Sequence, residues 1–378
     1  MLILLDCRPL QYAGPGSEKS RLIFSAAAAL AGQKAVKWLL AVDHTYRPEM
    51  LPQLPGAGVL TRRAFPGRAG WQLWYDWQIP RMARQQGADL VMLTAGIAAA
   101  LPAIPQCLWM PERADPAEAS TANRYPSFYR GRLADSLQRA SAIFCFSTRD
   151  RDCLVSRHPP AEEKILILPP APAEGIAILS MVEKEDIKQG YTGGKEYFLA
   201  NLDGTGEEGA INLLKAFSLF KKRQLSNMQL FLTGRMRASS AGIRQRLETY
   251  KYRQDVHWPA ELPESEGLQL AGAAYAHLFP ADGDTLGTPL LNAWKAGVPV
   301  ITVSGGRLAE MADDAALVAG MDDPASMATQ LMLIYKDERL RKDLIGKGLD
   351  RVGAFSRGRT TETVWDGICK TTGEQIPG

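Results

Sequence analysis

Short apolar runs alternate along the chain with longer segments in which apolar residues recur at helical spacing. In the first half, buried strands are predicted at residues 2–6, 37–43, 88–93, 106–110, 142–147 and 164–168. Helices are predicted at residues 18–32, 71–86, 127–140 and 148–157. Strands that alternate with helices in this way predict βαβ units and a parallel sheet covered on both faces.

A proline-rich segment, 169–175 "PPAPAEG", interrupts this alternation, which then starts again. The second half has predicted strands at 196–201, 228–233, 274–280 and 299–303. Its predicted helices are 209–223, 239–251, 288–296, 323–336, 338–348 and 357–370. The expected fold is α/β, with two Rossmann-like, doubly wound parallel-sheet domains that face a cleft.

We place the first domain at 1–175 and the second at 190–355, with a linker near 169–190. We expect residues 356–378 to form a C-terminal helix that packs back toward the first domain.

Composition agrees with a soluble globular protein: 378 residues, 46% hydrophobic and 22% charged. The net charge of +3 does not indicate a nucleic-acid partner. Five cysteines without a CxxC pair and four scattered histidines favour a reducing, cytoplasmic location and argue against a metal site. The chain has no apolar stretch of the ~18 residues needed for a transmembrane helix. Residues 1–10, "MLILLDCRPL", have the pattern of a first strand and not of a signal peptide.

The stretch 283–301, "GDTLGTPLLNAWKAGVPVI", predicts a loop, a helix and a strand. Thr288 is the predicted N-cap and Pro289 the first helical residue. The free N–H groups at such a helix start favour an anion, most often a phosphate. Asp284 and Asn292 lie eight residues apart and could reach one ligand there. The alternative is that Asp284 is a loop or capping residue and that Asn292 is solvated.

This second half resembles the C-terminal domain of the group 1 (family 4) retaining glycosyltransferases, which have the GT-B fold. The resemblance rests on 287–331, "GTPLLNAWKAGVPVITVSGGRLAEMADDAALVAGMDDPASMATQL", and continues through 337–368. Residues 196–233 resemble the first strand, helix and second strand of that domain. The resemblance is weaker in the first half, where 5–30 and 129–154 carry it.

The resemblance implies transfer of a sugar from a UDP- or GDP-linked donor, without a metal ion or other cofactor. It implies a donor domain at 190–355 and an acceptor-side domain at 1–175. Asp284 and Glu112 become the candidate catalytic residues. Donor binding is expected from Gly14, Gly16, Arg235, Thr285, Leu286, Gly287, Thr288, Asn292, Gly306 and Glu310.

Three features of the chain depart from the family pattern. Asp284 and Asn292 stand where the family usually has two glutamates, and Asn292 cannot accept two ribose hydroxyls as a carboxylate does. Glu207 and Glu208 stand where the family has a basic pair against the donor diphosphate. The alternative is that these two acids are only a solvated helix start, where they suit the helix dipole.

The third departure follows the strand at 106–110, where the family often has a histidine and this chain has Glu112 between a proline and an arginine. Glu112 could act on a hydroxyl or be structural. The missing positive charge could come from Arg235 and Arg237, which could equally be surface arginines.

Trp71, Trp74 and Trp77 are spaced at i, i+3 and i+6, which predicts one face of a helix. Packing in the core or in the wall of the cleft is the favoured interpretation. A platform for an acceptor is the alternative.

Two functions remain open. The first is an active hexosyltransferase-type glycosyltransferase with an unknown glycan or lipid-linked acceptor. The second is a catalytically impaired GT-B homologue that acts as a binding or scaffolding partner. A peripheral membrane or protein partner is also considered, as is a nucleotide-sugar epimerase. A nicotinamide dehydrogenase is disfavoured because "GPGSEK" (14–19) lacks the third glycine of its fingerprint.

Overall fold

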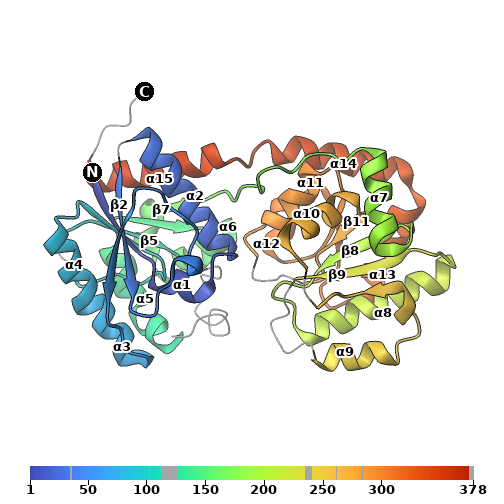
Figure 1. Ribbon diagram of the computed structural model, residues 1–378, viewed down its shortest axis with the longest axis horizontal. Coiled ribbons are helices and arrows are strands. Elements are labelled where there is room, and N and C mark those ends of the chain that lie inside the picture. Colours follow the sequence, from blue (N-terminus) through green and yellow to red (C-terminus); the bar gives the residue numbers. More distant parts are fainter. Residues whose placement is uncertain are drawn as a thin grey trace. The chain divides into compact units, whose positions relative to one another are not determined.

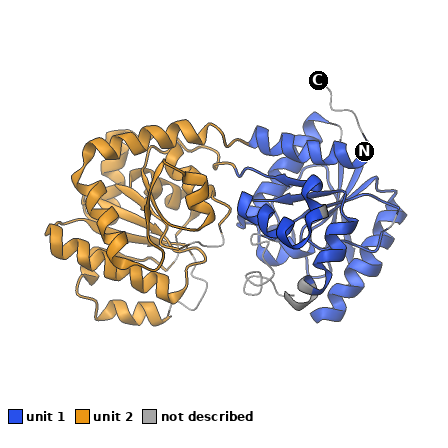
Figure 2. Cartoon of the chain, turned by 180° about the vertical axis from the view of Figure 1, so that it is seen from behind, with its two compact units in different colours: residues 1–170, 357–378 blue, residues 171–356 orange. Residues whose placement is uncertain are grey.

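The computed structural model describes residues 1–373 except 35, 102, 112–125, 235–240, 261 and 282–284. The chain divides into two compact units, shown in Figure 2. The first unit comprises Met1–Pro170 together with Arg357–Gly378, and the second comprises Ala171–Ser356.

Among the described residues of the first unit, seven parallel strands form one sheet in the order β3-β2-β1-β4-β5-β6-β7. The strands are β1 Leu2–Asp6, β2 Lys37–Asp43, β3 Gly58–Arg62, β4 Leu90–Leu93, β5 Gln106–Trp109, β6 Ala142–Cys145 and β7 Ile165–Ile167. Ile3 of β1 pairs with Trp38 of β2 on one side and with Leu90 of β4 on the other. All six strands predicted in this half are confirmed. The sequence did not indicate β3, because this edge strand is largely exposed and has no buried apolar run.

Helices cover both faces of this first sheet (Figure 1). They are α1 Arg8–Ala13, α2 Glu18–Gln33, α3 Gly67–Leu73, α4 Ile79–Gln86, α5 Pro126–Arg139, α6 Thr148–Arg157 and α15 Arg357–Thr372. A π-helical turn, Trp74–Gln78, joins α3 to α4, and short 3₁₀ turns occur at Pro48–Met50 and Pro159–Lys164. The core of one face brings α3, α4, α5 and α6 against the sheet. α15 packs against α2 and against β5, β6 and β7.

The three tryptophans predicted to share one helical face do not share one environment. Trp71 and Trp74 are buried, but Trp77 is 53% exposed, so the prediction is wrong for Trp77. The reason is the π turn, which advances less around the axis per residue than an α-helix does. Trp77 therefore lies further round from Trp74 than a regular α-helix would place it.

The second unit has the same architecture. Within the part of it that the structure describes, six parallel strands form a sheet in the order β10-β9-β8-β11-β12-β13. The strands are β8 Tyr197–Asn201, β9 Gln229–Thr233, β10 Val256–His257, β11 Ala276–Leu278, β12 Val300–Val303 and β13 Ala316–Ala319. A 3₁₀ turn at Arg253–Asp255 precedes β10. The helices are α7 Met181–Thr192, α8 Glu207–Gln224, α9 Ala241–Glu248, α10 Glu264–Ala273, α11 Thr288–Lys295, α12 Arg307–Ala312, α13 Pro324–Lys336 and α14 Glu338–Val352.

Two separate cores flank this second sheet. One brings α8, α9 and α13 against it, and the other brings α10, α11 and α12. Together the two units confirm the predicted class, α/β with two doubly wound parallel sheets.

The segment predicted as a linker, 169–190, contains α7 over much of its length. Ser180 caps this helix, and its hydroxyl and the Glu183 side chain form a reciprocal capping box. The S-x-x-E pattern is a helix-start signal that the prediction of an extended linker overlooked.

None of the helices within the described residues has both the length and the apolar character required to cross a bilayer. In the same part of the chain, no group of three or more His, Cys, Asp or Glu side chains is placed to hold a metal ion.

Candidate functional site

The carboxyl edge of the second sheet is built mainly from backbone turns. Each of its four central strands is followed by a glycine with positive φ: 67° at Gly204, 85° at Gly234, 109° at Gly287 and 77° at Gly305. The chain runs outward from β8 to β10 and then returns to β11 on the other side of β8, so the topology switches between β8 and β11. Ligands of doubly wound sheets bind outside the carboxyl ends at such a switch point.

The loops after β8 and β11 meet at this edge. A methyl group placed on Gly209, in the first turn of α8, would lie 3.0 Å from the Thr205 side chain and 3.7 Å from Ala281. These contacts bring the start of α8 beside the loop that leads into α11. The predicted binding loop therefore lies at the switch point.

Thr285, Leu286 and Gly287 form the buried end of that loop. The Thr285 hydroxyl accepts a hydrogen bond of 3.0 Å from the Gly287 N–H. α11 begins at Thr288 with Gly287 as its N-cap, so the prediction of Thr288 as the cap is shifted by one residue. Pro289 lies in the first turn, where its missing N–H breaks no helical bond.

Gly287 is required mainly by its backbone conformation, because a φ of 109° is strained for any residue with a side chain. A Cβ would also lie 2.5 Å from the Met311 sulfur, at the far end of a flexible side chain that would have to shift. The start of α11 therefore packs closely against the Met311 side chain.

Arg307 is a buried cation at this edge that the sequence analysis did not single out. It begins α12, is 7% exposed, and its guanidinium Nη1 donates a 2.8 Å hydrogen bond to the Thr285 carbonyl. Its place directly after "GG" in 305–307 was the available signal. The arrangement puts a positive charge against the loop that opens α11.

Asn292 is buried within α11, so the alternative in which it is solvated is wrong. Its side-chain oxygen accepts a 2.8 Å hydrogen bond from the Ala173 N–H. This bond attaches the segment that enters the second unit to α11. The side chain thus has a structural contact that the sequence did not indicate.

Glu207 and Glu208 are both exposed and form the first turn of α8. The carboxylate of Glu207 lies 3.9 Å from the Arg246 guanidinium of α9. Both side chains are mostly solvated, so this ion pair adds little to stability. Acidic side chains in this position, at a helix N-terminus, interact favourably with the helix dipole.

The remaining predicted residues are distributed over both units. Gly306 is the N-cap of α12, while its neighbour Gly305 has the positive φ. Glu310 is exposed in the first turn of α12. Gly14 and Gly16 belong to the first unit, in the loop between α1 and α2, and Gly14 has φ 87°. Asp284, Glu112 and Arg235, with Arg237, lie outside the described residues.

His277 lies in β11, the strand that leads into the α11 loop. It is 3% exposed and stacks on Phe279 with ring centroids 4.6 Å apart, and neither ring nitrogen has a hydrogen-bond partner among the residues that the structure describes. Burial lowers the pKa of His277 to about 3, so the ring is neutral at physiological pH.

The carboxyl edge of the first sheet is closed by charged side chains. Arg8 donates to the carbonyls of Gly70 (3.2 Å) and Phe65 (2.8 Å) and lies 3.5 Å from the Asp43 carboxylate. Its guanidinium stacks on Trp71 at 3.8 Å. Nearby, Lys19 is buried and donates to the carbonyls that follow β4 and β5.

Asp6 ends β1 in the same cluster and is fully buried. Its carboxylate accepts hydrogen bonds from the Trp74 indole (3.0 Å) and the Tyr75 hydroxyl (2.9 Å). Burial raises the pKa of Asp6 to about 6, although these hydrogen bonds oppose the shift. The charges at this edge thus face other protein groups.

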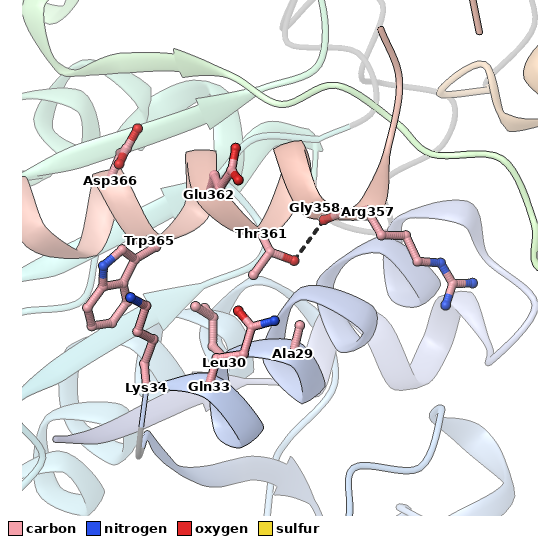
Figure 3. A pocket seen from close by; sticks show the side chains of 10 residues that line it. All are labelled: Ala29, Leu30, Gln33, Lys34, Arg357, Gly358, Thr361, Glu362, Trp365 and Asp366. Carbon is pink, nitrogen blue, oxygen red and sulfur yellow. Dashed lines mark hydrogen bonds between the residues drawn. The ribbon is translucent and has the colours of Figure 1, made fainter. Parts of the chain in front are cut away.

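A separate pocket of about 490 Å³ lies in the first unit between α2 and α15 (Figure 3). Lys34 and Trp365 line one end, where the Lys34 ammonium lies 5.3 Å from the indole. The Thr361 hydroxyl donates a 2.8 Å hydrogen bond to the Arg357 carbonyl within its wall. Its lining, taken over the described residues, includes no predicted site residue.

Residues 182–351 match the family model described as glycosyl transferases group 1. This stretch is therefore similar to the group 1 glycosyltransferases, and the resemblance indicated by the sequence is confirmed. The O-antigen chain mannosyltransferase B of Escherichia coli is 26% identical over 153 residues. That match spans 40% of this chain and 40% of the length of the relative.

Solved structures show that the fold is GT-B across both units. WaaG, described as a glycosyltransferase involved in lipopolysaccharide biosynthesis, aligns with a TM-score of 0.70 at 16% identity, covering 97% of this chain and 99% of its own. HepE from Anabaena, in complex with UDP-glucose, aligns with a TM-score of 0.77 at 12% identity, covering 97% of this chain and 99% of its own.

Proposed function

We propose that the chain is a retaining glycosyltransferase of the hexosyltransferase type that uses a nucleotide-diphosphate sugar. The observation that supports this most strongly is the convergence of glycine turns and the α11 start at the switch point of a group 1 domain. Backbone N–H groups at such turns and at a helix start suit a diphosphate. A neighbour of the same fold is described as bound to UDP-glucose.

In the reaction, the bond between the anomeric carbon and the diphosphate oxygen breaks, and a bond to an acceptor oxygen forms. The leaving nucleoside diphosphate carries the negative charge that develops. The α11 start and the buried Arg307 are the groups we assign to stabilising it, in the position that a metal ion takes in other transferases. The acceptor hydroxyl gives its proton to the leaving diphosphate in the same transfer, so that atoms and charge balance.

For the acceptor, we propose a glycan or a lipid-linked glycan. The matched relatives support this, since one is described as an O-antigen chain mannosyltransferase and another as acting in lipopolysaccharide biosynthesis.

The first test is calorimetric titration of the full chain with UDP, GDP, UDP-glucose and GDP-mannose. We expect one nucleotide and its sugar to bind, and we expect Arg307→Gln to lower the affinity for that nucleotide by about tenfold. Lys295→Gln, at the opposite end of α11, is the matched control and should leave affinity unchanged. Absence of binding to every nucleotide would contradict the proposal.

A second candidate is a GT-B protein that binds a ligand or partner without turnover. Two observations favour it: the Asn292 oxygen is occupied by Ala173, and Glu207 and Glu208 stand where the family has cations. Nucleotide binding together with no release of nucleotide from any donor, over a panel of glycan acceptors, would support this candidate. Release of UDP or GDP that depends on an acceptor would exclude it.

A further inference from the structure

The outer side of the helix that runs from α3 through the π turn to α4 exposes large apolar side chains. Phe65, just before the helix, is 47% exposed, Leu73 is 36% exposed and Trp77 is 53% exposed. The opposite side of the same helix is buried in the core of the first unit, through Trp74 and Ile79. Core packing therefore accounts for one side of this helix, whereas the apolar side chains named above on its other side are exposed.

The same region concentrates positive charge. Residues 58–88 contain five arginines and one acidic residue, Asp76, whereas the whole chain has a net charge of only +3. Asp76 is engaged by Arg132 of α5 through two hydrogen bonds of 2.9 and 2.6 Å. All of the five arginines are exposed: Arg62, Arg63, Arg68, Arg81 and Arg84.

The apolar and basic side chains form one surface. The Gln78 side chain donates a 2.7 Å hydrogen bond to the Arg63 carbonyl, so the segment before α3 lies along the helix. The Arg63 guanidinium lies 5.7 Å from the Phe65 ring, and that of Arg81 lies 5.3 Å from the Trp77 ring. Figure 1 shows α3 and α4 along one side of the first unit. We call the exposed side chains of residues 62–84 the arginine–aromatic face.

We propose that the arginine–aromatic face docks the protein on the surface of an anionic lipid bilayer. Guanidinium groups bind phosphate in a bidentate geometry, and tryptophan favours the headgroup level, where its ring is apolar and its N–H is solvated. A nucleic acid would account for the arginines but not for the exposed Leu73. An acidic protein would be a different kind of partner, and the experiment below distinguishes it from a bilayer.

The π turn at Trp74–Gln78 is the local structural feature that exposes Trp77 on this face. It turns Trp77 away from the core that holds Trp71 and Trp74, and so presents one of the three tryptophans to solvent. Irregular turns of this kind occur frequently at functional sites of helices.

The test is co-sedimentation of the full chain with vesicles. Phosphatidylcholine vesicles with about 30% phosphatidylglycerol should bind, and phosphatidylcholine alone should bind at least tenfold more weakly. Raising the salt from about 0.1 M to about 0.5 M should release the protein, because it screens the arginines. Arg81→Gln with Arg84→Gln should weaken binding by roughly 20-fold, and Phe65→Ser with Trp77→Ser by at least tenfold.

Two matched controls lie in the second unit. Met181→Ser with Val182→Ser removes side chains that are 70% and 71% exposed, but next to the acidic Glu183. Arg339→Gln with Lys342→Gln removes two exposed positive charges from α14. Both should leave vesicle binding unchanged. Near-ultraviolet circular dichroism checks that all variants remain folded.

Equal binding to neutral and anionic vesicles, or equal losses in the control variants, would overturn the proposal. Binding to an acidic polypeptide or to DNA without binding to vesicles would also overturn it. The inference does not rest on the proposed transferase activity. Nucleotide affinity, measured on the same variants in solution, should be unchanged, so failure of one proposal is distinguishable from failure of the other.

Discussion

The two sheets have the same topology around their switch points, but their carboxyl edges are built differently. In the first unit, the Arg8 guanidinium donates to backbone carbonyls and pairs with the Asp43 carboxylate, and the Asp6 carboxylate accepts a bond from the Arg8 N–H. In the second unit, glycine turns such as Gly204 and Gly287 bring backbone close to the edge. Charged side chains that already bond within the protein stabilise a unit, whereas glycine backbone at turns allows a ligand to approach closely, although the Gly287 N–H itself donates to the Thr285 hydroxyl.

This contrast indicates that equivalent edges of two similar sheets can serve different roles, stability in one unit and ligand binding in the other. Breaking the first edge should mainly change stability, and breaking the second should mainly change ligand binding. Four sets of substitutions test this difference.

The largest effect is expected from Arg8→Ala in the first unit. The change removes two bonds to carbonyls and leaves Asp43 without its buried cation, so the free energy of unfolding should fall by about 3–5 kcal/mol. Arg307→Ala should cost less, about 1–3 kcal/mol. Urea unfolding measures both variants. Equal losses of stability would show that the two edges do not differ as described.

The next effect concerns glycines with positive φ. Gly287→Ala meets Met311 at 2.5 Å in addition to backbone strain, so we expect a loss of about 2–4 kcal/mol and of nucleotide binding. Gly14→Ala is the control, since its φ is also positive but no atom lies within 4 Å of the added Cβ. It should cost only about 1–2 kcal/mol. Similar losses in both variants would remove the argument for close packing at Gly287.

The third prediction concerns pH. Asp6 in β1 and His277 in β11 should change the free energy of unfolding in opposite directions as the pH rises. The pKa of Asp6 is raised from 3.8 to about 6, so its contribution to stability is lost as pH rises through that window. The pKa of His277 is lowered from 6.5 to about 3, so stability is lost as pH falls below 6.5.

Urea unfolding of Asp6→Asn and His277→Phe across this range should therefore show two opposite differences from the unsubstituted protein. Each should amount to about 3 kcal/mol, for Asp6 when the pH reaches about 6 and for His277 when the pH has fallen to about 4.5. A difference that does not vary with pH, in either variant, would contradict the burial argument for that residue.

The smallest effect is expected at Asn292. Asn292→Ala removes the acceptor of the Ala173 N–H and should lower the free energy of unfolding by about 1 kcal/mol. Asn292→Glu restores the carboxylate of the family pattern, and nucleotide affinity should rise by about tenfold if ribose binding uses this position. Unchanged affinity in the glutamate variant would show that the side chain serves only the contact with Ala173.

Much of the fold could be predicted from the sequence, because buried parallel strands are continuous apolar runs and the helices between them have regular spacing. β3 escaped prediction because this short edge strand is largely exposed and has no buried apolar run. α7 was taken as linker because proline and glycine nearby outweighed its capping signal. Trp77 was misplaced because a π turn has no sequence pattern of its own.

The site was predictable only in part. The loop that opens α11 could be located from its Gly, Thr and Pro residues and from the family resemblance. The partner of Asn292 could not, because Ala173 lies 119 positions away in the chain. Arg307 was visible in the sequence, but its burial against Thr285 depends on the packing of α12 beside that loop.

By itself, the sequence determined the class of fold, the order of most strands and helices, and the family resemblance of the second domain. These follow from local periodicity and from turn residues, which act over short stretches of chain. Only the tertiary structure decided which polar groups are already bonded, which glycines are tightly packed, and which side of the α3–α4 helix faces solvent. Those properties depend on contacts between distant segments, and the energy of a buried charge or an exposed tryptophan is set by such neighbours.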